Sequence, residues 1–231
     1  MTDGFPGFSK DLITFYQDLK ENNNRDWFHA NRDRYRDVVQ YPMSDFIAAM
    51  APRLEAIAPC YAADPRPNGG SMFRIHRDVR FSKDKKPYKE HAACQFRHQA
   101  GKDAHAPGFY VHIALDGIRY GGGVWLPPSP KLALIREAID QKQEEWTALT
   151  TDPDLLAHFG GIHGDGLKRA PKGYDPDHPL IEDLKRKTFF LMQPAPVERI
   201  LDPGFMDDVE AAFEATSPFM RFLTNAVELP Y

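Results

Sequence analysis

The chain has 231 residues, of which 42% are hydrophobic and 27% charged, and its formal net charge is −4. This composition is typical of a globular protein and excludes a chain that is mainly disordered. The negative charge excludes an overall basic field that would attract nucleic acid, so any affinity for anions must come from a local cluster. No run approaches the ~18 apolar residues of a membrane span, and no signal peptide is visible, so we expect a cytoplasmic protein without a membrane partner.

The two cysteines, Cys60 and Cys94, lie far apart and lack CxxC spacing. That usage is typical of a reducing compartment, so we predict that neither forms a disulfide. His91, Cys94 and His98 have a loosely metal-like spacing, but on a strand His91 and Cys94 would point to opposite faces. The sequence therefore predicts no metal site, and none of its motifs predicts another cofactor.

The first quarter of the chain is predicted to be helical. Ser9 is placed to cap a helix whose apolar residues recur at helical spacing and which the asparagines at 22–24 end. Asp26 is expected to cap a second helix, and a third amphipathic helix covers residues 43–57. A loop dense in proline and glycine follows at residues 59–70.

After this loop the pattern changes to alternation, which predicts strands. The first predicted strand covers residues 73–81, with Phe73, Ile75, Val79 and Phe81 turned to the core and Arg74, His76, Asp78 and Arg80 on the opposite face. Further strands are predicted at 94–97, 109–115 and 118–125, with a turn at Asp116–Gly117. The glycines at 121–123 indicate a bulge or a close approach of another backbone. The middle of the chain thus predicts an antiparallel meander.

The last part of the chain is predicted to be mostly helical. Helices are expected at 132–139, at 144–149, after Pro153, at 180–185 and from Pro203 onward, with one late strand at 188–192. The glycine-rich loop at 160–166 follows a predicted helix, so it favours helix termination over a phosphate cradle. The predicted fold is a single α+β domain over residues 1–231: N-terminal helices, a mainly antiparallel sheet and further helices.

Residues 73–91 carry the strongest functional signal, because cations crowd an alternating segment there. Arginine forks suit phosphate and carboxylate, since two parallel N–H bonds meet two oxygens. His76, or His112 on a neighbouring strand, is the candidate for proton transfer near neutral pH. The candidate ligand-binding residues of this region are Arg74, Arg77, Arg80, Lys86, Tyr88, Arg97 and Tyr110.

The same cations allow a second interpretation, a sheet face turned to water. Asp78, Asp84 and Glu90 would then offset the positive charge in exposed ion pairs that add little stability. If the strand register cooperates, the neighbouring strands add four further side chains to this polar face, namely Gln95, Arg97, Tyr110 and His112.

Several motifs give the chain a resemblance to a known family. They are NNNRDWF at 22–28, RIHRDVRFSKDKKPYKEH at 74–91, GFYVHI at 108–113, GGGVWLPP at 121–128, RAPKGYDPDHP at 169–179 and KTFFL at 187–191. Together they resemble the bacterial and fungal family called domain of unknown function 2461. The resemblance spans nearly the whole chain and implies a single domain, but it implies no activity, cofactor or catalytic residue.

The RAPKGYDPDHP stretch places Arg169 and Tyr174 in a loop constrained by proline and glycine. If this loop folds over the sheet, it completes a pocket, and we predict one shared site with the arginine-rich strand. The alternative is a turn whose charges are solvated.

The favoured function is binding of, or enzymatic action on, a small anionic ligand that carries phosphate or carboxylate. A nucleic-acid or nucleotide-binding module is the second hypothesis, with Tyr88 and Tyr110 as stacking surfaces, and the net charge disfavours it. A protein-interaction adaptor that uses the Trp- and Tyr-bearing N-terminal helices is the third, and the sequence identifies no partner protein. An enclosed pocket would favour the small ligand, and an open basic groove the polymer.

Overall fold

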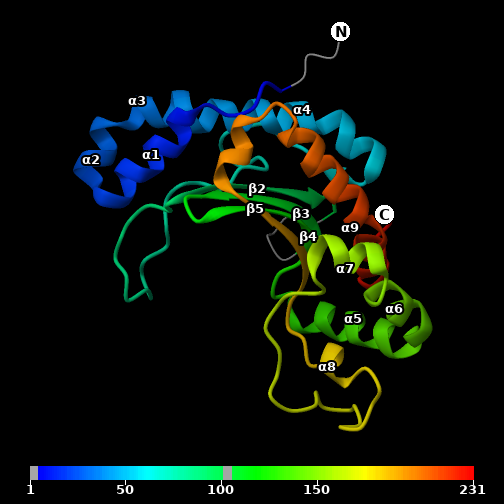
Figure 1. Cartoon of the computed structure of the whole chain (residues 1–231). Coiled ribbons are helices and arrows are strands. Elements are labelled where there is room, and N and C mark those ends of the chain that lie inside the picture. The colour runs from blue at the N-terminus through cyan, green and yellow to red at the C-terminus, as the bar shows by residue number, and fades with distance from the viewer. Residues whose placement is uncertain (1–4, 101–105) are drawn as a thin grey trace.

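The N-terminal quarter of the protein forms a layer of helices, the last of which lies over the sheet (Figure 1). The computed structural model describes residues 5–100 and 106–231. The helices of this layer are α1 (Lys10–Glu21), α2 (Arg25–Ala30), α3 (Arg32–Tyr35), the π-helical segment η1 (Arg36–Gln40) and α4 (Tyr41–Ile57). The Ser9 side chain accepts a hydrogen bond from the Asp11 N–H, which confirms the predicted cap of α1. The cap of α2 is Asn24, which accepts from the Trp27 N–H at 3.0 Å, so the prediction of Asp26 was wrong.

The described residues build one antiparallel sheet of five strands in the order β1-β2-β3-β4-β5. The strands are β1 (Tyr61–Ala62), β2 (His91–His98), β3 (Gly108–Ala114), β4 (Gly117–Val124) and β5 (Phe189–Ala195). Strand β4 follows β3 through a two-residue turn flanked by the pair Ala114 and Gly117. The predicted meander is therefore confirmed.

Residues 73–81 do not form a strand of this sheet, so that prediction was wrong. They belong to an irregular ribbon whose two sides meet through the bridge between His76 and Tyr88. Beyond this bridge, residues 76–88 project from the body as a hairpin arm (Figure 1). Ile75 is buried as expected, but Phe81 is 94% exposed.

One face of the sheet is buried under α4 and α9 (Phe205–Ala226) (Figure 1). Alternate strand residues fill this core face, among them Cys94, Phe96, Phe109, Val111, Ile113, Ile118, Tyr120, Phe189 and Leu191. Gly122 lies directly under α9, where an added Cβ would be 2.9 Å from Met220 Sδ. The missing side chain thus lets the helix approach the sheet closely.

Further helices pack on α9, on β5 and on one another. They are α5 (Ser129–Gln141), α6 (Gln143–Thr150), α7 (Pro153–Phe159), α8 (Ile181–Leu184) and the 3₁₀ segment η2 (Val197–Leu201). Gly160 ends α7 in the left-handed conformation, as the sequence predicts. Over residues 5–100 and 106–231, no helix is both long and apolar enough to span a bilayer.

A connected hydrophobic core joins all three parts of the described chain. It runs from Phe15 and Phe46 in the N-terminal helices, through Phe109 in the sheet, to Trp146 and Phe213 in the later helices. The protein is a single α+β domain with N-terminal helices, an antiparallel sheet and further helices, as predicted from the sequence.

Candidate functional site

The second face of the sheet, which we call the open face, carries the polar strand residues. The register aligns them in rows across the sheet: Ala93, His112, Arg119 and Pro194; Gln95, Tyr110, Gly121 and Met192; Arg97, Gly108, Gly123 and Phe190. This confirms that Gln95, Arg97, Tyr110 and His112 share one face. In the described residues, no labelled helix lies across it in Figure 1.

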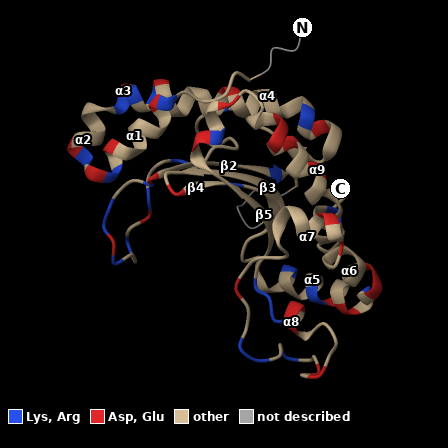
Figure 2. Ribbon diagram, viewed as in Figure 1, with Lys and Arg blue, Asp and Glu red and all other residues tan. Residues whose placement is uncertain are grey.

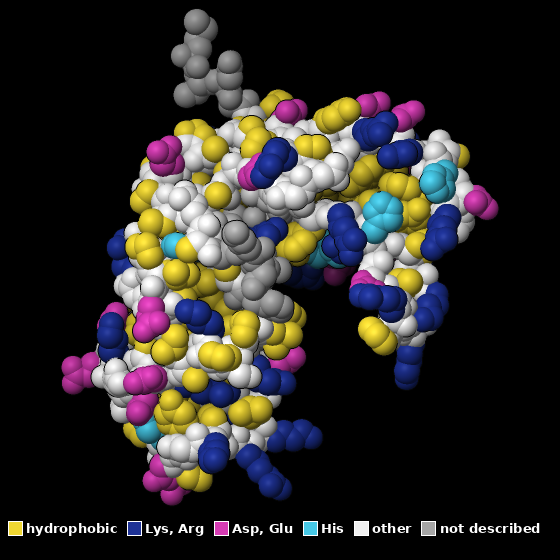
Figure 3. Space-filling view, turned by 180° about the vertical axis from the view of Figure 1, so that it is seen from behind, with side chains coloured by type: hydrophobic (Ala, Val, Ile, Leu, Met, Phe, Trp, Pro, Cys, Tyr) yellow, Lys and Arg dark blue, Asp and Glu magenta, His cyan; other side chains and the backbone are white. Residues whose placement is uncertain are grey.

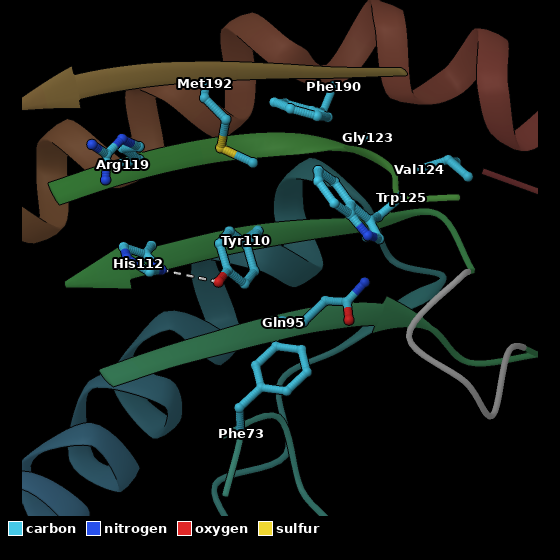
Figure 4. A pocket seen from close by; sticks show the side chains of 11 residues that line it. Phe73, Gln95, Tyr110, His112, Arg119, Gly123, Val124, Trp125, Phe190 and Met192 are labelled. Atoms are coloured by element: carbon cyan, nitrogen blue, oxygen red, sulfur yellow. Dashed lines mark hydrogen bonds between the residues drawn. The ribbon is translucent and has the colours of Figure 1, made fainter. Parts of the chain in front are cut away.

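A groove of about 420 Å³ lies on the open face. Its lining residues are Phe73, Gln95, Gly108, Tyr110, His112, Arg119, Gly123, Val124, Trp125, Phe190 and Met192. The groove is polar at one end, where His112 and Arg119 lie, and aromatic at the other, where the rings of Trp125 and Phe190 are 5.5 Å apart (Figure 4). Its volume and mixed lining are those of a typical small-molecule site, which holds roughly 300–1,000 Å³.

Glycines of β4 give the groove a flat floor. An added Cβ would lie 2.0 Å from the Leu191 carbonyl oxygen at Gly121 and 2.1 Å from the Phe189 carbonyl oxygen at Gly123. The backbones of β4 and β5 therefore approach closely at both positions, as the three glycines predicted. At these two positions β4 adds no side chain to the groove, whereas Arg119 of the same strand lines its polar end.

The polar end of the groove holds a pair of neutral histidines. The Tyr110 hydroxyl and His112 Nδ1 share a hydrogen bond of 3.1 Å, and the rings of His112 and His91 lie 4.3 Å apart. Burial, followed by the Arg119 charge, lowers the pKa of His112. Burial and His112 lower the pKa of His91 to about 4. Both rings are therefore uncharged near pH 7 and accept protons only from stronger acids.

The buried ring of His91 should make folding sensitive to mild acid. The unfolded chain takes up a proton below its ordinary pKa of ~6.5, whereas the folded protein resists protonation until pH about 4. The free energy of unfolding should thus decrease as the pH drops from ~6.5 to about 4. We expect a decrease on the order of 2 kcal/mol, less than for a fully buried ring, because His91 is only partly buried.

Thermal melts between pH 7.5 and 4 test this expectation. The charged or titratable groups that act on His91 are His112, Lys89, Asp116 and Glu90. They remain in a His91→Gln variant. The melting temperature of that variant should therefore decrease less steeply with falling pH than that of the wild type. Parallel profiles for the two proteins would show that His91 does not carry the effect.

Arg119 supplies the permanent positive charge of the groove. Its guanidinium donates to Asp116 at 3.1 Å, and both side chains are largely exposed, 44% for Arg119 and 70% for Asp116. An exposed pair of this kind contributes little free energy. Arg119 is therefore able to exchange its carboxylate partner for an anion in the groove.

Three cations of residues 73–91 are paired with acids of the same segment. Arg77 contacts Asp84 at 2.7 Å, Arg80 contacts Asp78 at 2.7 Å, and Lys86 contacts Glu90 at 2.8 Å. The Arg80 guanidinium holds the pKa of Asp78 at about 2. For Arg77, Arg80 and Lys86, the structure thus agrees with the solvated alternative of the sequence analysis.

Tyr88 is a core residue, so its predicted role in ligand binding was wrong. It is 3% exposed and stacks on Phe28 with ring centroids 4.1 Å apart. Arg97 extends from the open face at the edge of β2, beyond the residues that line the groove. Arg74 and His76 lie on the other side of the ribbon, against the N-terminal helices.

Arg169 and Tyr174 do not share a site with the arginine-rich segment, so that prediction was also wrong. Figure 2 shows the hairpin arm and the loop before α8 as two separate charged projections on different parts of the molecule. Tyr174 leans against α5, where burial and then the Asp140 charge raise its pKa. Arg169 is exposed.

The groove contains residues that the sequence analysis did not select. Trp125, Phe190 and Met192 form its aromatic and apolar part, and Arg119 adds a cation to its polar end. The turn after β3 offered a signal for Arg119, because a two-residue turn between 114 and 117 places residue 119 opposite His112.

Neither cysteine contributes to this site. Both are free, and Cys94 lies in the core, where burial raises the pKa of its thiol. His91 and Cys94 point to opposite faces, as predicted. Within the described ranges, no three His, Cys, Asp or Glu side chains are grouped so that they could hold a metal ion.

These features define an α+β protein with a groove on the open face of an antiparallel sheet. The chain belongs to the family described as conserved hypothetical protein DUF2461, whose family model matches residues 11–222. This confirms the family resemblance of the sequence motifs. A comparison with curated proteins found no match.

Proposed function

We propose that the open-face groove binds a small organic anion, a carboxylate or a phosphate attached to an aromatic or apolar body. The main support for this proposal is that one groove of about 420 Å³ combines a polar end with an aromatic end. Arg119 would bind the anionic group, and Trp125 and Phe190 would pack against the body of the ligand. The weak Asp116 pair of Arg119 supports this, because little free energy is lost when the pair opens.

His112 gives the groove a group for proton transfer. When Nδ1–H donates to the Tyr110 oxygen, Nε2 is the ring nitrogen that accepts a proton. Because its pKa is lowered, the ring is neutral at pH 7 and is a proton acceptor beside the proposed anion site. Any reaction at this site would therefore use His112 as a base, while Arg119 stabilises negative charge.

A nucleic-acid strand is a second candidate ligand, favoured by the basic side chains on both sides of the sheet. Figure 3 shows Lys and Arg side chains on the hairpin arm and on the lower part of the molecule, with a hollow between them. The exposed lysines include Lys83 and Lys85 in the arm and Lys168 and Lys172 in the loop before α8. The aromatic groove residues would then stack on bases.

An Arg119→Gln variant tests the proposed anion site. A set of aryl carboxylates and aryl phosphates is screened by thermal shift, and hits are measured by calorimetry and by the fluorescence of the half-exposed Trp125. Arg119→Gln should weaken binding by about tenfold or more, because a charged, forked hydrogen bond is lost. Trp125→Phe should retain binding but remove the fluorescence response.

Arg80→Gln is the matched control, since Arg80 is also exposed and paired with an acid but lies outside the groove. A labelled single-stranded oligonucleotide is titrated in parallel. Salt-sensitive binding of the oligonucleotide without any aryl hit would favour the nucleic-acid candidate. Equal affinities of wild type and Arg119→Gln for every hit would refute the proposed role of Arg119.

A further inference from the structure

A second, smaller hollow lies between the N-terminal helices and the base of the hairpin arm. It has a volume of about 160 Å³ and an apolar floor of Phe28, Tyr35 and Ile75. Its rim is polar and consists of Arg32, Arg36, Gln40, Pro67, Asn68, Arg74 and His76. Arginine and histidine side chains gather in this region, on the right of Figure 3. We call it the basic hollow, and it lies on the other side of the ribbon from the groove.

The described residues that line the basic hollow include three arginines and no carboxylate. Within residues 5–100 and 106–231, Arg32 and Arg74 form no ion pair, and no Asp or Glu lines the hollow. Arg36 contacts only the exposed Asp33, at 3.0 Å. The arginines Arg77 and Arg80 of the neighbouring hairpin arm, in contrast, each contact an acid. Arg32 and Arg74 therefore differ from the paired arginines beside them.

The charges of the rim act on one another. Burial, followed by the charges of Arg74, Arg32 and His29, lowers the pKa of His76. Like charges held this close destabilise the site unless an anion enters it, because each cation raises the electrostatic energy of the others. A bound anion would therefore relieve repulsion in the basic hollow. It would relieve less at Arg77 and Arg80 of the hairpin arm, which already contact acids.

The π-helical segment aligns the rim residues that come from the helices. In η1 the Tyr41 N–H donates to the Arg36 carbonyl, five residues back, so this turn is wider than an α turn. Arg36 follows Arg32 by four residues of α-helix, so its side chain is rotated slightly past that of Arg32 around the helix axis. The wider π turn rotates the Gln40 side chain back in the opposite sense. All three side chains thus reach the same hollow. Single π turns within α-helices are rare and frequent at functional sites.

We propose that the basic hollow is a second binding site, for a phosphate-sized oxyanion that is either free or the end of a phosphomonoester. Arg74 from the ribbon and Arg32 from α3 approach the ligand from two sides with forked donors. Arg36 joins them by exchanging Asp33 for the ligand, and Asn68 and His76 add polar contacts at the rim.

Calorimetric and NMR titrations with inorganic phosphate and with methyl phosphate test this proposal. The full chain should bind at least one of them saturably, with chemical-shift changes at Arg74 and His76. Arg74→Gln and Arg32→Gln should each weaken binding about tenfold or more, because each removes a charged fork. Tighter binding of methyl phosphate assigns the site to phosphomonoesters, and tighter binding of inorganic phosphate assigns it to the free ion.

Two control variants separate the basic hollow from other cations. Arg80→Gln, an exposed arginine of the hairpin arm, should bind phosphate like the wild type. Lys85→Gln, at an exposed lysine of the same arm, should do so too. The proposal is overturned if neither probe saturates at tens of millimolar, if Arg74→Gln and Arg32→Gln both bind like the wild type, or if Arg80→Gln abolishes binding. Melting curves of all variants exclude misfolding as the cause of a loss.

Discussion

Replacement of Gly123 by alanine should lower the free energy of unfolding by about 3 kcal/mol or more. The new Cβ would lie 2.1 Å from the Phe189 carbonyl oxygen and 2.5 Å from the Phe190 Cα, so two strand backbones would have to separate. The φ of +154° at Gly123 adds strain for any residue with a side chain. Urea unfolding followed by circular dichroism measures the loss.

Gly166→Ala is the matched control for this substitution. An added Cβ at Gly166 would meet its nearest neighbour at 3.4 Å, an ordinary contact. The control should therefore change stability by less than about 1 kcal/mol. If Gly123→Ala unfolds at the same urea concentration as the wild type, β4 and β5 do not approach as closely as described.

Two aromatic residues of the hairpin region should differ sharply in their contribution to stability. Tyr88→Ala should cost about 3 kcal/mol, because it removes a ring that is 3% exposed and stacked on Phe28. Phe81→Ala should change stability by no more than about 0.5 kcal/mol, since that ring is 94% exposed. The two variants lie in one segment and remove similar rings, so burial is the main difference between them.

Equilibrium unfolding of both variants measures this contrast, and Tyr88→Phe serves as the conservative replacement. Phe at position 88 keeps the stacked ring and should retain most of the stability. A large loss in Phe81→Ala would mean that the tip of the hairpin arm packs against the body. A negligible loss in Tyr88→Ala would mean that Tyr88 is not anchored on Phe28.

The sheet could be predicted because its signals are local and agree with one another. Phe109, Val111 and Ile113 alternate with polar residues, and the short turn before Gly117 sets the register of the next strand. Once the register is known, the shared face of Gln95, Tyr110 and His112 follows from geometry.

The hairpin arm was misread because alternation alone does not provide a partner strand. Asp78 accepts from the Arg80 N–H at 3.2 Å, and Asp84 accepts from the Lys86 N–H at 3.0 Å. Such hydrogen bonds between side chain and nearby backbone compete with a strand ladder. Asp78, Asp84 and Glu90 thus reach the cations once the chain bends.

The groove was only partly predictable, because its two ends come from distant parts of the chain. Tyr110 and His112 belong to the central strand, whereas Phe190 and Met192 come from β5, which reaches β4 after more than 60 intervening residues. No local pattern states which strand lies beside β4. Trp125 follows the last residue of β4, where alternation no longer determines the direction of a side chain.

The hairpin arm also bears on how the two halves of the molecule are joined. Its tip is held by contacts within residues 77–86, whereas its base is tied to the body by hydrogen bonds from Phe73 N–H to the Ala93 carbonyl and from Gln95 N–H to the Ser71 carbonyl. Elsewhere, β1 pairs with β2 and α4 packs on α9 across the same divide. The part of the chain before the arm is therefore held to the part after it by noncovalent contacts. The covalent link through the tip of the arm is not needed to keep the two parts together.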